Sequence, residues 1–230
     1  MRLLNMDKEL KLLLDNSKLD QLYKHNLFSI KSICEFLGVW DNYSPEDKFK
    51  LENFTKRDTD INKHFTYKGT YNTNYTYSEI IRSGVDDIIE KINKHRKPTE
   101  KDVFVDVGSG CGKLVLHTAI KSDIKTLIGV EVVPQRLRYS KRIKEEILPE
   151  NKSVFFIEKN IIDFDISIAT VVFTNDTSFT LDLIDGIFNK LPKGCHFITS
   201  TKIPSCKILK DEFLVDTSWG SKLKLYYYIK

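Results

Sequence analysis

The chain has 230 residues, with 36 lysine or arginine residues against 32 aspartate or glutamate residues, a formal net charge of +4. This length allows one large domain, or a main domain with a small helical one. The small positive excess lacks the basic signature of a dedicated nucleic-acid-binding protein, and it favours acidic partners only weakly.

The cysteine content points away from a disulfide-rich or metal-binding protein. Cys34, Cys111, Cys195 and Cys206 form no C-x-x-C pair and no ligand set with histidines, so we expect no disulfide framework and no metal. Residues 1–14 contain only short apolar runs broken by charges, unlike a signal peptide or a spanning helix. We therefore expect an intracellular protein that does not enter a membrane, with nucleus and cytoplasm both open.

The N-terminal part of the chain is predicted to be helical and accessory. Residues 3–40 carry apolar side chains at helical spacing, interrupted at Asp15-Asn16-Ser17 and at Gly38, which predicts two or three short amphipathic helices. We expect residues 1–64 to form this region, as a structural brace or as a substrate-docking module. The loop-rich stretch at residues 41–78 contains four tyrosines, at positions 67, 71, 75 and 77, which either line a pocket for a cationic group or pack the loop onto a sheet.

A further helix is predicted from residue 80 to the basic turn at residues 94–97, where Pro98 stops it. Cations in the last turn complement the helix dipole, so this basic cluster needs no nucleic-acid partner. From here onward strands and helices alternate, which predicts a doubly wound α/β fold.

The most informative stretch is the apolar run that begins at Val103 and breaks into the glycines Gly108, Gly110 and Gly112. A buried strand followed by such a loop and a helix is typical of a nucleotide-type cofactor site. A dinucleotide motif requires G-x-G-x-x-G/A, and Lys113 occupies the position of the third small residue. No G-x-x-x-x-G-K-[ST] phosphate loop occurs either.

Two acids indicate a cationic ligand. Asp106 stands just before the glycines, where it would repel a pyrophosphate but attract the ammonium and sulfonium charges of S-adenosylmethionine. Glu131 ends the next predicted strand, residues 127–131, about 20 residues beyond the glycines, where an acid can hold both ribose hydroxyls. We therefore predict an S-adenosylmethionine site rather than a tight turn alone.

The later strands complete the predicted site. The third strand, residues 154–157, leads to Asn160 and Ile161, a polar and an apolar residue able to bond and stack on an adenine. The fourth, residues 169–173, leads to the loop at residues 175–179. Because ligands bind beyond the carboxyl ends of such strands, we expect the reaction centre there. Helix 135–147 is expected to present its basic residues, Arg136 among them, to solvent.

These motifs resemble a known family. The matching residues, in order, are Tyr77-Ser78-Glu79 before a helix, Val105 to Gly112, Gly129-Val130-Glu131, the 175–179 loop, and Ser218-Trp219 followed by Tyr226-Tyr227. Over residues 65–230 the chain is similar to the non-SET histone-lysine methyltransferases, the "disruptor of telomeric silencing" family. It departs from the family pattern at Lys113, where glutamine is usual, at Asn175-Asp176, where two asparagines are usual, and at Asn160-Ile161, where aspartate and phenylalanine are usual.

The resemblance implies a doubly wound, seven-stranded class I methyltransferase sheet with helices on both faces, and a catalytic domain at residues 65–230. It implies a channel for a lysine side chain, lined near the methyl group by Asp176 and Phe179. The expected cofactor-binding residues are Tyr77, Ser78, Glu79, Asp106, Gly108, Gly110, Gly112, Lys113, Glu131, Val132, Asn160 and Ile161. The expected catalytic residues are Asn175, Asp176, Phe179, Trp219 and Tyr226.

The function expected from this resemblance is S-adenosylmethionine-dependent methylation of a lysine in a protein, with histones among the substrates implied. Methylation of an amino group on a nucleic-acid base is a second hypothesis, but the 175–179 loop lacks the two prolines common in those enzymes. A non-catalytic partner with the same fold is a third. Such a partner is expected to have a damaged glycine loop or to lack the ribose acid, and neither loss is present.

Overall fold

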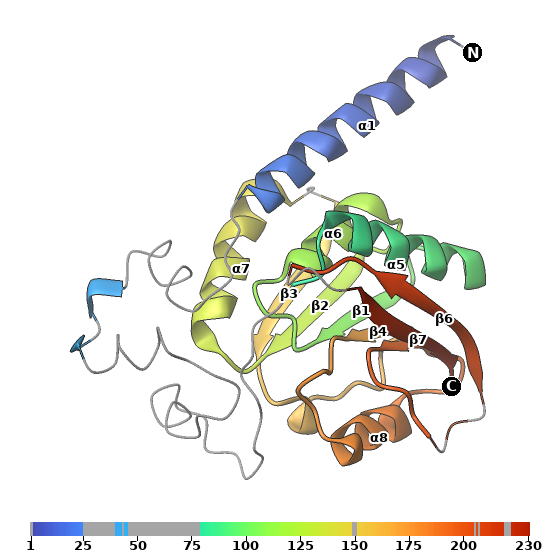
Figure 1. The fold of residues 1–230 in the computed structure, drawn as a ribbon. Helices are drawn as coiled ribbons and strands as arrows, with labels where there is room; N and C mark the ends of the chain where they lie inside the picture. Colours follow the sequence, from blue (N-terminus) through green and yellow to red (C-terminus); the bar gives the residue numbers. More distant parts are fainter. Residues whose placement is uncertain are drawn as a thin grey trace.

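The computed structural model describes residues 2–24, 40–42, 44–45, 79–148, 151–204, 206, 208–218 and 222–230 (Figure 1). The helical elements are α1 (Arg2–Tyr23), η1 (Trp40–Asn42), α5 (Arg82–His95), α6 (Lys113–Lys121), α7 (Pro134–Ile147), η2 (Ile161–Asp163) and α8 (Leu181–Lys190). The strands are β1 (Val103–Val107), β2 (Thr126–Glu131), β3 (Ser153–Glu158), β4 (Val171–Thr174), β5 (His196–Thr199), β6 (Leu209–Val215) and β7 (Leu223–Ile229).

The seven strands form one sheet in the order β3-β2-β1-β4-β5-β7-β6. The first five are parallel, and β7 runs antiparallel between β5 and β6. The predicted doubly wound, seven-stranded sheet is therefore confirmed. The strand order changes direction between β1 and β4, and ligands of open α/β sheets bind beyond the carboxyl ends of the strands at such a point.

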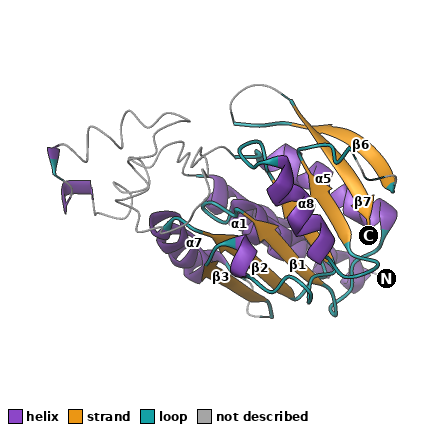
Figure 2. Ribbon diagram, turned by 90° about the horizontal axis from the view of Figure 1, so that it is seen from below, coloured by secondary structure: helices purple, strands orange, loops and turns teal. Residues whose placement is uncertain are grey.

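Helices cover both faces of the sheet, as predicted (Figures 1 and 2). In β1, Phe104 belongs to one hydrophobic core with residues of α1, α5, α6 and α7, whereas its neighbour Val105 belongs to a second core with residues of α8. Because both faces are buried, the central strands read as continuous apolar runs rather than alternating ones.

The strand register explains why the two acids of the predicted site share a face. Asp106 of β1 pairs with Gly129 of β2, and Glu131 lies two residues beyond Gly129. Side chains two residues apart in a strand point to the same side of the sheet. Asp106 and Glu131 therefore lie on the same side, near the carboxyl ends of adjacent strands.

The N-terminal region differs from the prediction. The interruption expected at Asp15-Asn16-Ser17 is wrong, because α1 runs through it without a break. These polar residues are satisfied by side chains: Lys11 Nζ donates to Asp15 at 2.6 Å, and Arg82 donates to Asn16 at 3.0 Å. The predicted boundary at residue 64 and the tyrosine-rich loop lie outside the described residues.

The C-terminal half of α1 is part of the main core. Leu19 and Leu22 are fully buried in the same cluster as Phe104. Within the described ranges, no helix is long and apolar enough to cross a membrane.

Candidate functional site

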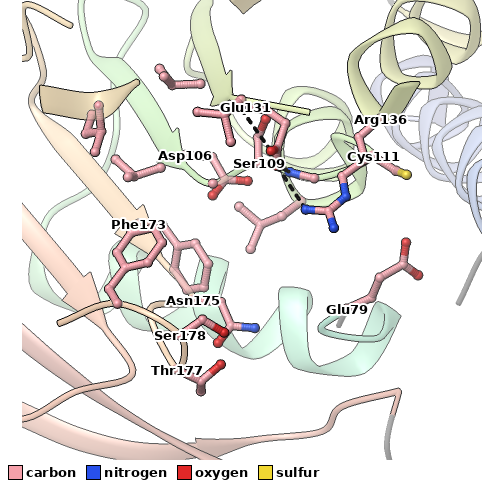
Figure 3. A pocket seen from close by; sticks show the side chains of 18 of the residues that line it. Glu79, Asp106, Ser109, Cys111, Glu131, Arg136, Phe173, Asn175, Thr177 and Ser178 are labelled. Carbon is pink, nitrogen blue, oxygen red and sulfur yellow. Dashed lines mark hydrogen bonds and ion pairs between the residues drawn. The ribbon is translucent and has the colours of Figure 1, made fainter. Parts of the chain in front are cut away.

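A cavity opens at the carboxyl ends of β1 to β4, on the side predicted from the strand order (Figure 3). Its empty volume is about 1120 Å³, part of it open to solvent. The predicted site residues that line it are Glu79, Asp106, Gly108, Gly110, Lys113, Glu131, Val132, Asn160, Ile161, Asn175 and Phe179. Tyr77, Ser78 and Trp219 lie outside the described residues.

The glycine loop requires glycine for two reasons. Gly108, Gly110 and Gly112 have φ of +75°, +54° and +74°, a left-handed conformation that other residues rarely adopt. A Cβ on Gly112 would lie 2.5 Å from the Phe156 ring. Gly112 does not line the cavity. Its lack of a side chain allows the loop to approach β3, and its expected cofactor contact stays a prediction.

Glu131 ties the glycine loop to the end of β2. Its Oε2 accepts a hydrogen bond from the Gly110 N–H at 2.8 Å, and its Oε1 accepts from the Val132 and Val133 N–H groups, both at 2.9 Å. Arg136 Nη1 lies 3.7 Å from Oε2, and both side chains are nearly fully buried. The carboxylate thus holds the loop in place while it forms part of the cavity wall.

Asp106 has a very different environment. Its side chain is 3% exposed and lines the cavity, and no hydrogen bond to its carboxylate is formed among the described residues. Burial, and then the nearby charge of Glu131, raise the pKa of Asp106 to about 8. A buried carboxylate without a partner is costly to ionise. A cation bound in the cavity would therefore be strongly stabilised by this group.

Lys113 begins α6 and forms a buried ion pair across the cavity wall. Its Nζ lies 2.7 Å from Glu79 Oε2, and the two side chains are 4% and 10% exposed. The position that a dinucleotide motif reserves for a small residue thus carries a cation, which in turn fixes an acid at the cavity.

The predicted adenine-binding pair also lines the cavity. Asn160 Oδ1 accepts from the Ile162 N–H at 3.1 Å, which caps the short helix η2. Ile161 follows as the first residue of η2 and is 7% exposed. The capping bond fixes the loop so that a polar and an apolar side chain stand together at the end of β3.

The loop after β4 divides into cavity residues and an anchor. Asn175 and Phe179 line the cavity, but Asp176 does not. The Asp176 carboxylate is fully buried; it accepts from Thr199 Oγ1 at 2.7 Å and from the Ser200 N–H at 2.7 Å. The resemblance implied that Asp176 lines the lysine channel near the methyl group, whereas its side chain turns back and fastens the loop to the end of β5.

Tyr226 is not among the residues that line this cavity, and it lies in β7 opposite Thr199 of β5. Lys202 Nζ is 5.8 Å from the centre of its ring. Its expected place in the outer part of the lysine channel therefore stays a prediction.

The sequence reasoning missed Arg136 and Phe173, both of which line the cavity. Arg136 was expected on a solvated helix face, yet it is 5% exposed and paired with Glu131. Its place in the first turn of α7, five residues after the ribose acid, was the available signal. Phe173 lies near the end of β4 on the same face as Val171. In the described part of the chain, no group of three or more His, Cys, Asp or Glu side chains is arranged to hold a metal ion.

Comparison with known protein families identifies the family of this chain. Residues 58–217 match the sequence model of the family described as histone methylation protein DOT1. The chain is 30% identical over 105 residues to a Drosophila melanogaster protein named histone-lysine N-methyltransferase, H3 lysine-79 specific. This match covers 40% of this chain and only 6% of that protein. It is 25% identical over 137 residues to a protein-lysine N-methyltransferase of Saccharolobus islandicus (strain REY15A), which covers 59% of this chain and 76% of that protein.

Among solved structures, the magnesium protoporphyrin IX methyltransferase (ChlM) from Synechocystis PCC 6803 with bound SAH has a TM-score of 0.50. It is 11% identical, and the match covers 64% of this chain and 82% of that one. At this identity the likeness concerns the fold alone, which it identifies as the class I methyltransferase sheet.

Proposed function

The chain belongs to the histone methylation protein DOT1 family, and from this premise we propose that it is an S-adenosylmethionine-dependent protein-lysine N-methyltransferase. The family match covers 160 residues, more than half of the chain. The names of the two relatives, one a histone-lysine and one a protein-lysine methyltransferase, support a lysine acceptor.

The observation that carries the proposal is the Asp106 carboxylate, which is buried in the cavity wall without a hydrogen-bond partner among the described residues. Such a group favours a ligand with positive charge and disfavours one with phosphates. S-adenosylmethionine carries an ammonium and a sulfonium group and no phosphate, so the residues present fit this cofactor. When bound, it supplies a methyl group on a cationic sulfur.

Other residues would hold the remaining parts of the cofactor. Glu131, with Val132 beside it, would receive the ribose hydroxyls, in line with the role of an acid at this strand end. Asn160 and Ile161 would contact the adenine. Lys113 and Glu79 form the wall nearest the start of α5.

The acceptor lysine would enter beside the β4 loop. Phe173, Phe179 and Asn175 line this part of the cavity. Aromatic walls exclude water, and desolvation favours the neutral amine that a methyl transfer requires, since burial lowers the pKa of a lysine. The chain's contribution is then mostly alignment of the amine and exclusion of water. Asp176 would hold the loop, and Trp219 and Tyr226 would line the outer part of the channel.

The experiment that tests the activity is transfer of a tritiated methyl group from S-adenosylmethionine to separate acceptors: purified histones, whole-cell protein, RNA and DNA. The proposal predicts label in protein that acid hydrolysis recovers as methyl-lysine. Label found only in RNA or DNA would overturn the lysine assignment in favour of base methylation. Methyl-lysine label in whole-cell protein but not in purified histones would support a lysine acceptor in a protein other than a histone.

A further inference from the structure

The N-terminal helix reaches the cavity wall, although it lies outside the residues that match the family. The family match begins at residue 58, whereas α1 ends at Tyr23. Its last turns pack against α6, the helix that begins at Lys113 (Figure 1). Tyr23, in the last turn of α1, contacts the cavity-lining cation Lys113.

Two side chains from two other helices fix the Tyr23 ring. The Tyr23 hydroxyl lies 2.9 Å from His117 Nδ1, and His117 Nε2 lies 3.1 Å from Asp86 Oδ1. Because burial lowers the pKa of His117 to about 4, its imidazole is neutral. The Asp86 carboxylate can only accept, so Nε2 carries the proton and Nδ1 accepts from the Tyr23 hydroxyl. Since His117 is fully buried, these bonds leave the ring of Tyr23 little freedom.

The face of the same ring contacts Lys113. The Lys113 ammonium lies 5.8 Å from the centre of the Tyr23 ring and 2.7 Å from Glu79 Oε2. A cation within about 6 Å of an aromatic face is stabilised by the ring, more so where water is excluded. Lys113 is 4% exposed, so its ammonium group depends on such contacts in place of water.

We propose that Tyr23 is a positioning residue of the cofactor pocket, which holds the Lys113 ammonium against Glu79 and so links the docking of α1 to cofactor affinity. This inference rests on the proposed function, because it assumes that the cavity binds S-adenosylmethionine. It assigns the N-terminal helix a role at the site beyond bracing the fold. It also explains how a lysine is accommodated at the nearly buried position 113, since its ammonium group has both an acid and an aromatic partner.

The test is a double-mutant cycle with Tyr23→Leu, Lys113→Gln and the double variant, in the full chain. Affinity for S-adenosylmethionine is measured by calorimetry, and stability by urea unfolding. Tyr23→Phe keeps the ring over Lys113 and loses only the hydroxyl. Leu22→Ala is the matched control, because it removes buried packing from the same turn of α1; Leu22 does not line the cavity.

We expect Tyr23→Leu to weaken S-adenosylmethionine binding by about threefold to tenfold, the size of a cation–π contact. Tyr23→Phe should lose less affinity than Tyr23→Leu, because it keeps the ring face over Lys113 but loses the hydroxyl bond that orients the ring. Leu22→Ala should lower stability without changing the affinity for S-adenosylmethionine. In the Lys113→Gln background, Tyr23→Leu should have no further effect on affinity. The changes that Tyr23→Leu and Lys113→Gln cause in the free energy of unfolding should not add up in the double variant.

Two results would overturn the inference while the proposed function stands: wild-type affinity in Tyr23→Leu, or an equal loss of affinity in the Lys113→Gln background. An equal loss in Leu22→Ala would also overturn it, because any loosening of α1 would then suffice. Additive unfolding effects would refute the Tyr23–Lys113 contact without any ligand. A wild-type chain that binds no S-adenosylmethionine would overturn the proposed function and this role together.

Discussion

The Asp106 and Glu131 carboxylates line the same cavity but are stabilised in opposite ways. Glu131 accepts three backbone N–H hydrogen bonds and lies near Arg136, whereas the Asp106 carboxylate has no hydrogen bond among the described residues. Glu131 therefore maintains the shape of the site, and Asp106 supplies the charge that a cation would neutralise.

Asp106→Asn should stabilise the ligand-free protein. The pKa of Asp106 is raised from 3.8 to about 8, so its contribution to stability is present below pH 3.8 and is lost as the pH rises through 8. In Asp106→Asn the side chain does not ionise, so stability is not lost as the pH rises. Because each tenfold change in a proton equilibrium is worth about 1.4 kcal/mol, the gain at pH 9 should be roughly 3 kcal/mol or more. Urea unfolding at pH 4 and pH 9 measures it; a variant no more stable than wild type at pH 9 would contradict the raised pKa.

Binding of a cationic cofactor should release protons near pH 7. The ligand-free Asp106 is mostly protonated there, because its pKa is about 8, and a bound cation favours the carboxylate. Calorimetric titrations of S-adenosylmethionine in phosphate and in Tris buffer should therefore give different heats at pH 7. The difference should shrink at pH 9, where Asp106 is already ionised. Heats independent of the buffer at pH 7 would count against this coupling.

Gly112→Ala should destabilise the protein by about 2 to 4 kcal/mol, because it combines a left-handed backbone with a clash against Phe156. Gly194→Ala is the matched control: its φ is +82°, but nothing lies within 4 Å of the added Cβ. The control should cost only about 1 kcal/mol of backbone strain. Equal losses in urea unfolding would show that the close approach of the loop to β3 is not what requires glycine.

Asp176→Asn should lower stability by roughly 1.5 to 3 kcal/mol, because an amide cannot accept all the hydrogen bonds from Thr199 and Ser200. Since Asp176 does not line the cavity, affinity for S-adenosylmethionine should remain near that of wild type, and methyl transfer should slow as the β4 loop loosens. Asp182→Asn, at an exposed position in α8, is the control. A drop in transfer without any loss of stability would instead indicate direct contact with the acceptor.

Much of the fold could be predicted because its signals are local. The run from Val103 to Val107 is apolar and is followed by glycines, and the same pattern of strand and helix recurs along the chain. The resemblance to the family supplied the number of strands in the sheet. The positions of Asp106, Glu131, Asn160 and Ile161 at one edge follow from parallel strand pairing.

The errors concern contacts between residues distant in sequence. α1 continues through Asp15 and Asn16, and Asn16 is bonded to Arg82, 66 positions away. Asp176 turns from the cavity because Thr199 and Ser200 lie beside it in the next strand and its loop. No local pattern around these residues indicates such partners, so only the assembled fold could reveal them.

The most direct test of the account is calorimetric titration of the wild-type chain and Asp106→Asn with S-adenosylmethionine at pH 8, with NAD as the phosphate-bearing comparison ligand. We expect saturable binding of S-adenosylmethionine to the wild type, a large loss of that binding in Asp106→Asn, and no binding of NAD. Equal binding to both proteins, or tighter binding of NAD than of S-adenosylmethionine, would contradict it.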